Sequence, residues 1–306
     1  MSRGDHIVVA AGAAASGPLH KTLDCRAEPS GGSAVSGFAM MTSCQEEPAD
    51  TAFTAEWEVW HRRREERLKQ PQGWLALVGL HWLASGKNRF EGLPGVFHLA
   101  EGRVTLKAAP EDGYSIGGVP VSARELESES AEKPDKLQIG NRTMLVIRRG
   151  DQLALRVWDA ASPLRTTFRG IDTFPPSARW RIYASWEAYP VPRAVEISSA
   201  AGPPTKALVP GRAHFGVAGD RLSLEPTLDG DELFFVFRDA TARAETYGGG
   251  RFLVAELPRD GKVVLDFNRA VNPPCVFTPY ATCPLPEPQN VLPIRIDAGE
   301  KRYGDH

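Results

Sequence analysis

Two polar stretches in the C-terminal third of the chain carry side chains that could bind a ligand or catalyse a reaction. The first, FRDATARAETYGGGRF (residues 237–252), has three consecutive glycines before Arg251. Glycines let a backbone approach a ligand closely, and successive N–H groups can surround an anion. Arg238 and Arg251 would add charge-assisted hydrogen bonds to a carboxylate or phosphate. The alternative is a flexible hairpin in which an Asp–Arg pair neutralises itself.

The second stretch, DFNRAVNPPCVFTPYATCPLPEP (residues 266–288), combines prolines with asparagines, cysteines and a tyrosine. Asp266 and Asn268 alternate with Phe267, so we expect them to share a face at the end of a strand. The two prolines after Asn272 predict a fixed turn. The segment is therefore expected to be stiff and polar.

Cys275 and Cys283 lie eight residues apart in this second stretch, and several interpretations compete. They could form a disulfide, bind a metal, supply a nucleophile at Cys275, or remain buried thiols. The spacing is not CxxC and no histidine is near in sequence, which disfavours a metal site and a cysteine–histidine pair. Four cysteines in 306 residues indicate a reducing compartment, so buried thiols are the favoured interpretation.

Bulk properties and missing motifs exclude several classes of function. There is no GxSxG, HExxH, GxxxxGKS/T or GxGxxG pattern and no EF-hand loop, and the seven histidines are scattered. The net charge of −2 and the pI near 6.4 argue against nucleic acid or an anionic membrane as the main partner. No run approaches the roughly 18 apolar residues of a membrane helix. We expect no cofactor, no metal and a cytoplasmic location.

The residues before the strands are expected to be helical. TAEWEVWHRRREERLKQP predicts a helix capped by Thr54 and stopped by Pro71. GWLALVGLHWLASG (residues 73–86) predicts a short buried helix or turn in which His81 packs in the core. The arginines at positions 62–64 could bind an anion, but a solvated helix face is favoured.

From about residue 90 the hydrophobic period changes to two, which predicts a mainly β fold with antiparallel strands. Several short strands first predict a β-sandwich, whose strand order resembles the forkhead-associated sandwich in outline only. After a proline-rich break at 160–178, seven strand candidates favour an antiparallel barrel-like β-domain sealed by the proline-rich C-terminal segment. The predicted parts are a disordered leader (1–50), a helical segment (51–88), the β-sandwich (89–160) and the barrel-like domain (161–306).

Several longer stretches carry a family resemblance. In order between Trp57 and Tyr303, they are GWLALVGLHWL, ETYGGGRFL, VVLDFNRAVNPPCVFTPYATCPLP and NVLPIRIDAGEKRY. They resemble the bacterial and archaeal family called domain of unknown function 1684. The family usually has alanine where this chain has Val276, and more residues where it has GKNRFEGLPGVF.

The resemblance implies no particular activity, but it implies that the two polar stretches face one pocket at the end of the second β-domain. The site residues that it implies are Glu245, Tyr247, Arg251, Asp266, Asn268, Asn272, Cys275, Tyr280 and Cys283.

We therefore predict that the protein binds a small polar or anionic ligand at its C-terminal β-domain. One alternative is a hydrolase or transferase, in which Cys275, Asp266 or Glu245 acts as nucleophile or base. The other alternative is a protein-interaction module, in which the sandwich binds a protein partner.

Overall fold

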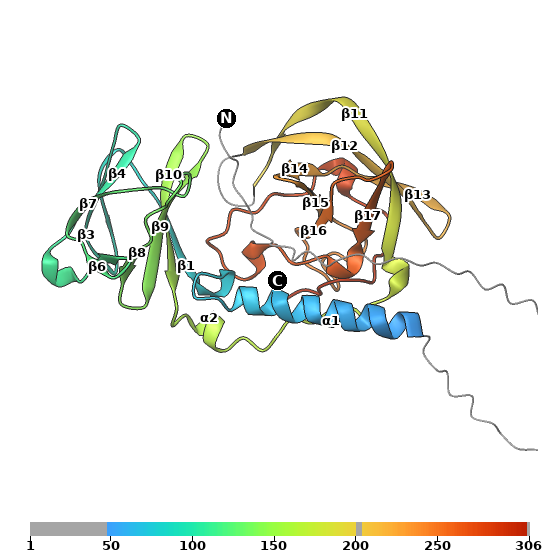
Figure 1. Ribbon diagram of the computed structural model, residues 1–306, viewed down its shortest axis with the longest axis horizontal. Coiled ribbons are helices and arrows are strands. Elements are labelled where there is room, and N and C mark those ends of the chain that lie inside the picture. The colour runs from blue at the N-terminus through green and yellow to red at the C-terminus, as the bar shows by residue number, and fades with distance from the viewer. Residues whose placement is uncertain (1–47, 200–203, 305–306) are drawn as a thin grey trace, which may run out of the picture.

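The computed structural model describes residues 48–199 and 204–304. Within these residues the protein is mainly β, with four antiparallel sheets and one long N-terminal helix. Figure 1 shows the strands of residues 77–159 at one end of the molecule and those of residues 181–266 above the helix. The two groups of strands are consecutive in sequence.

Helix α1 (Pro48–Leu68) is longer than its sequence signals indicate. The prediction that Thr54 caps it is wrong, because the helix begins at Pro48 and Thr54 lies inside it. Proline is tolerated in the first turn, where no N–H is required. The predicted leader otherwise lies outside the described residues. None of the helices in the described part of the chain has both the length and the apolar character needed to cross a bilayer.

Residues 73–86, predicted to be a short buried helix or turn, contain a strand instead of a helix. A single 3-10 turn (Trp74–Ala76) leads into strand β1 (Leu77–Trp82), which pairs with a later strand. A short apolar run does not distinguish helix from strand, and the available partner strand decides. His81, predicted to pack in the core, is only partly buried: its ring lies 4.5 Å from that of Phe90, and burial lowers its pKa.

Residues 77–159 form two sheets that share one hydrophobic core. The remaining strands are β2 (Gly86–Phe90), β3 (Leu93–Ala100), β4 (Arg103–Lys107), β5 (Ser115–Ile116), β6 (Val119–Pro120), β7 (Ala123–Leu126), β8 (Leu137–Ile139), β9 (Arg142–Arg149) and β10 (Gln152–Asp159). One sheet has the order β1-β10-β9-β8-β5-β6 and the other β2-β3-β4-β7. Phe97 and Leu106 of the second sheet pack with Met144 and Leu155 of the first.

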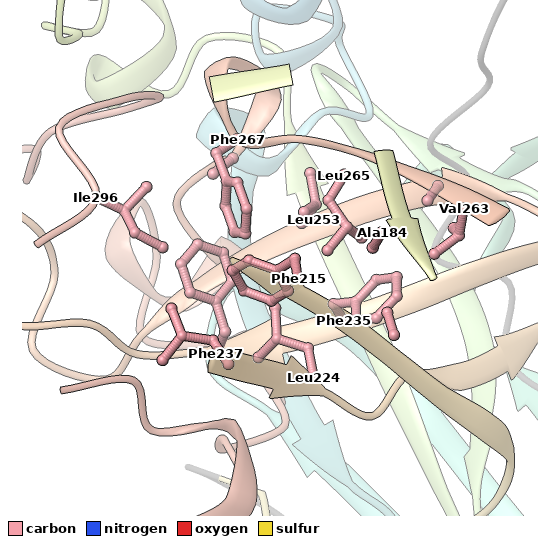
Figure 2. Packing of buried hydrophobic residues seen from close by; sticks show 14 of the residues in the cluster. Ala184, Phe215, Leu224, Phe235, Phe237, Leu253, Val263, Leu265, Phe267 and Ile296 are labelled. Carbon is pink, nitrogen blue, oxygen red and sulfur yellow. The ribbon is translucent and has the colours of Figure 1, made fainter. Parts of the chain in front are cut away.

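Residues 181–266 form two further sheets, reached through the short helix α2 (Pro163–Thr166). Their strands are β11 (Arg181–Ile197), β12 (Thr205–Val217), β13 (Asp220–Leu224), β14 (Thr227–Asp229), β15 (Glu232–Phe237), β16 (Arg251–Glu256) and β17 (Lys262–Asp266). The orders are β13-β12-β11-β17 and β14-β15-β16. Figure 2 shows Phe215, Phe235, Phe237 and Phe267 meeting in the core between these sheets.

The expected barrel is not formed: the strands that the structure describes between residues 181 and 266 make two sheets and no closed barrel. The free edge of β16 is instead occupied by the C-terminal segment. Phe252 and Val271 exchange both backbone hydrogen bonds at 2.9 Å. Directly after β15, the Arg238 N–H donates to the Asn290 carbonyl at 3.0 Å, and the Arg238 carbonyl accepts the Leu292 N–H at 2.7 Å. The C-terminal segment therefore supplies backbone hydrogen-bond partners at both positions, where a further strand would otherwise pair.

Candidate functional site

Arg251 lies inside the protein, where it binds other parts of the chain. Its side chain is 1% exposed and its Nη2 donates to Asp239 Oδ1 at 3.1 Å and to the Ile296 carbonyl at 3.2 Å. Its Nη1 donates to the Ala298 carbonyl. Asp239 also accepts the Ile296 N–H at 2.8 Å. Arg251 and Asp239 therefore fasten the C-terminal segment to β16.

The glycine loop before Arg251 makes a tight turn. The Gly250 N–H donates to the Tyr247 carbonyl at 3.1 Å, so this amide is already used. Gly250 has a φ of +96°, and a Cβ there would lie 2.6 Å from the Phe237 carbonyl oxygen. Only glycine fits this close approach. Glu245, another predicted site residue, pairs instead with Arg295 at 2.6 Å on the surface.

Asp266 and Asn268 are bonded to each other and hold the end of β17 against helix α1. Asp266 accepts from Arg181 Nε at 3.0 Å and from Asn268 Nδ2 at 2.9 Å. Asn268 also exchanges hydrogen bonds with the backbone of Ser177, and its carbonyl accepts the Trp57 indole N–H at 2.9 Å. These partners satisfy Asn268 fully, which assigns it a structural role.

Replacing Asp266 with alanine should lower the free energy of unfolding by about 1.5–3 kcal/mol, because its hydrogen bonds are to charged or buried donors. Urea denaturation would measure the loss. Asp220→Ala is the matched control, since Asp220 is exposed at the first residue of β13. Equal stabilities of the two variants would contradict this role for Asp266.

Asn272 joins the C-terminal segment to helix α1. Its N–H donates to Glu300 Oε2 at 2.6 Å and its Nδ2 to the Lys301 carbonyl at 2.6 Å. Arg64 donates to both the Asn272 carbonyl (3.1 Å) and Glu300 (3.0 Å). The prediction of a solvated face is therefore wrong for Arg64, although Arg62 and Arg63 are exposed. The buried Asn272 Oδ1 has no donor among the described residues.

Cys275 and Cys283 are free thiols that contact each other. The Cys275 N–H donates to Cys283 Sγ at 3.1 Å, and Cys275 Sγ lies 3.7 Å from the Tyr247 hydroxyl. A hydrogen bond from the Cys283 thiol, aided by Tyr247, lowers the pKa of Cys275 to about 7 against the opposing effect of burial. The same pairing and burial raise the pKa of Cys283. Tyr280, nearby in sequence, is 38% exposed.

A groove of about 2060 Å³ runs between helix α1, strands β9 and β10, and the strands of residues 181–266. Of the predicted site residues, Asp266, Asn272 and Cys283 border it. Arg251 does not, and it shares no hydrogen bond with Asp266. The structure thus divides the predicted cluster into separate networks, of which only part reaches an open space.

The lining of this groove includes basic and aromatic side chains, and we use the name basic end for Arg67, Trp74, Arg156 and Asn272, all of which border the groove. The Arg156 guanidinium lies 5.6 Å from the centre of the Trp74 ring. Arg67 is half-buried, and no hydrogen bond or ion pair joins its guanidinium to another described residue. Burial, with the charges of Arg64 and Arg63, lowers the pKa of Arg67.

Comparison with known families identifies the second half of the chain. Residues 166–301 match the family model described as "Protein of unknown function (DUF1684)". This segment is a DUF1684 domain. A solved structure, the solution NMR structure of an uncharacterized protein of Haloarcula marismortui, is 29% identical over 46% of this chain and 81% of that chain, with a TM-score of 0.40. No curated protein matches.

The DUF1684 domain contains every site residue that the resemblance implied, but the groove extends beyond it. Arg67, Trp74 and Arg156 precede residue 166, so they lie outside the matched segment. The nearest sequence signal for an anion site here was the run of arginines at 62–64, and Arg67 lies one helical turn after it. Among the described residues, no three or more His, Cys, Asp or Glu side chains are grouped to hold a metal ion.

Proposed function

We propose that the protein binds a small anionic ligand at the basic end of the groove. The observation that carries this proposal is Arg67, a half-buried guanidinium that has no hydrogen-bond or ion-pair partner among the described residues. Burial of part of this side chain disfavours its charged form, and the charge of Glu300 opposes that effect. A carboxylate or phosphate would supply the counter-charge and charge-assisted hydrogen bonds together.

The neighbours of Arg67 indicate how the rest of such a ligand would be held. Trp74 and Arg156 offer a stacked aromatic and cationic surface, which suits a planar or charged group. The groove exceeds the roughly 300–1,000 Å³ of ordinary ligand sites, so a small ligand would fill only the basic end.

A thermal-shift titration of the full chain tests this function. Inorganic phosphate, pyrophosphate and citrate are added at fixed ionic strength, because a ligand selective for the folded state raises Tm. At least one of them should raise the Tm of the wild type. Arg67→Gln should weaken that ligand about 10- to 100-fold, since a hydrogen bond to a charged group contributes about 1.5–3 kcal/mol.

Arg63→Gln is the matched control, since Arg63 is on the same helix but exposed. It should bind as the wild type does. Equal weakening in both variants would indicate a general charge effect and contradict the proposed site. The absence of a shift with all three anions in the wild type would also contradict it.

A further inference from the structure

The segment between Cys275 and Cys283 holds two thiols together. It starts with a 3-10 turn (Pro274–Val276), and its side chains are anchored in two apolar clusters, Phe277 in one and Ala281 in the other. The Cys275 N–H points to Cys283 Sγ at 3.1 Å. Because both ends of the segment are packed, the pairing of the thiols is part of the folded structure.

The surroundings of Cys275 do not suit acyl or phosphoryl transfer. None of the described histidines hydrogen-bonds to either sulfur, so the cysteine has no base of the usual kind. Burial and the adjacent Cys275 raise the pKa of Tyr247 to about 12, so Tyr247 keeps its proton at neutral pH. The other neighbour is a second thiol. A thiol beside a thiol is the arrangement used in disulfide exchange.

We infer that Cys275 and Cys283 are a reversible two-electron redox pair that reacts with hydroperoxides. The Cys275 thiolate attacks the peroxide, forming an S–O bond and breaking the O–O bond. The product is a sulfenic acid and the leaving alkoxide or hydroxide takes up a proton. The Cys283 thiol then attacks the Cys275 sulfur, and its proton leaves with the sulfenic oxygen as water. A dithiol reductant returns both thiols and is itself oxidised to a disulfide.

The unequal exposure of the two thiols fixes their roles. Cys275 is partly exposed, whereas Cys283 is 3% exposed. Although Cys283 borders the groove, Cys275 has the larger exposed fraction, so the peroxide is expected to react at Cys275 and Cys283 to act as the resolving thiol. The lowered pKa of Cys275 supports the same order, because the thiolate is the reactive form. This inference does not depend on the proposed ligand site.

Peptide mapping of the full chain tests the inference without any substitution. The protein is treated with hydrogen peroxide, the remaining thiols are alkylated, and the cysteine peptides are identified by mass spectrometry. We expect a Cys275–Cys283 disulfide that a dithiol reductant reverses. Cys25 and Cys44, which lie outside the described residues, serve as internal references. Oxidation of Cys25 and Cys44 before any Cys275–Cys283 disulfide appears would overturn the inference.

Two variants separate a redox role from a packing role. Cys283→Ser retains an acceptor for the Cys275 N–H, and its Cys275 should accumulate as a dimedone-reactive sulfenic acid. Cys283→Ala should move the pH midpoint of Cys275 alkylation from about 7 toward the ordinary value, because Cys283 and Tyr247 are the titratable side chains that lower the pKa of Cys275. With an ordinary pKa of about 8.5, alkylation at pH 7 should slow about tenfold. An unchanged midpoint would overturn the inference.

Discussion

Replacing Arg251 with methionine is expected to lower the free energy of unfolding by about 3–5 kcal/mol, because it leaves the Asp239 carboxylate buried without its counter-charge. Both side chains are 1% exposed and their charged atoms lie 3.1 Å apart. The substitution also leaves the Ile296 and Ala298 carbonyls without their donor. Urea denaturation of the full chain, followed by tryptophan fluorescence, measures the loss.

Arg295→Met is the matched control for Arg251→Met. Arg295 belongs to the same C-terminal segment, but its ion pairs with Glu245 and Asp297 are exposed to solvent. Exposed pairs contribute little to stability, so the control should unfold almost as the wild type does. A loss no larger for Arg251→Met than for Arg295→Met would contradict the structural role of the buried pair.

A double-mutant cycle isolates the pair itself. Asp239→Asn removes the charge but keeps an acceptor for the Ile296 N–H. Combined with Arg251→Met, it should recover part of the stability that Arg251→Met loses, because no buried charge is then left alone. Strictly additive losses would show that the two charges do not interact. Because Arg251 binds the Ile296 and Ala298 carbonyls, an Arg251 variant would also disturb residues 296–298 and is a poor probe of ligand binding.

The strands are the part of the fold that the sequence predicts best, because their signals are local. Val104 and Leu106 alternate with polar residues and are buried on one face of β4. Strand β15 is marked by an unbroken apolar run, another local signal. The run is unbroken because the two faces of β15 pack into two different hydrophobic clusters. By contrast, residues 77–82 have a partner strand that only the folded chain brings to them.

The candidate site is harder to predict because its contacts join distant parts of the chain. The two polar stretches that contain Arg251 and Asp266 hold residues with several polar contacts, but residue type does not reveal which partner each will take. Arg251 binds Asp239 and Asp266 binds Arg181. A helix pattern likewise cannot distinguish Arg64, which meets a carboxylate 236 positions away, from exposed neighbours.

Glu300 provides the second large expected effect. Its side chain is 1% exposed, and it accepts hydrogen bonds from Arg64 at 3.0 Å and from the Asn272 N–H at 2.6 Å. Glu300→Gln keeps the shape but removes the charge opposite Arg64. We expect the free energy of unfolding to fall by about 2–4 kcal/mol. This loss is slightly smaller than that expected for a fully buried pair, because Arg64 is partly exposed and also binds the Asn272 carbonyl.

The expected consequence of Glu300→Gln is local as well as global, because the Arg64–Glu300 pair docks helix α1 on the DUF1684 domain. Hydrogen exchange should show faster exchange in α1 (Pro48–Leu68), while the amides of β15 stay protected. Glu66→Gln is the matched control, since Glu66 is exposed on the same helix. Equal protection of α1 in both variants would contradict the docking role.

Glu300 does not border the groove, whereas Asn272 and Arg67 do. It positions Asn272 directly and Arg67 through helix α1, so Glu300→Gln should also reduce the anion-dependent rise in Tm that Arg67→Gln is expected to weaken. Binding that survives unchanged in Glu300→Gln, with α1 exchanging faster, would mean that the ligand is held by the DUF1684 domain alone. Loss of binding in both Glu300→Gln and Arg67→Gln would instead mean that helix α1 and the DUF1684 domain both contribute to one site.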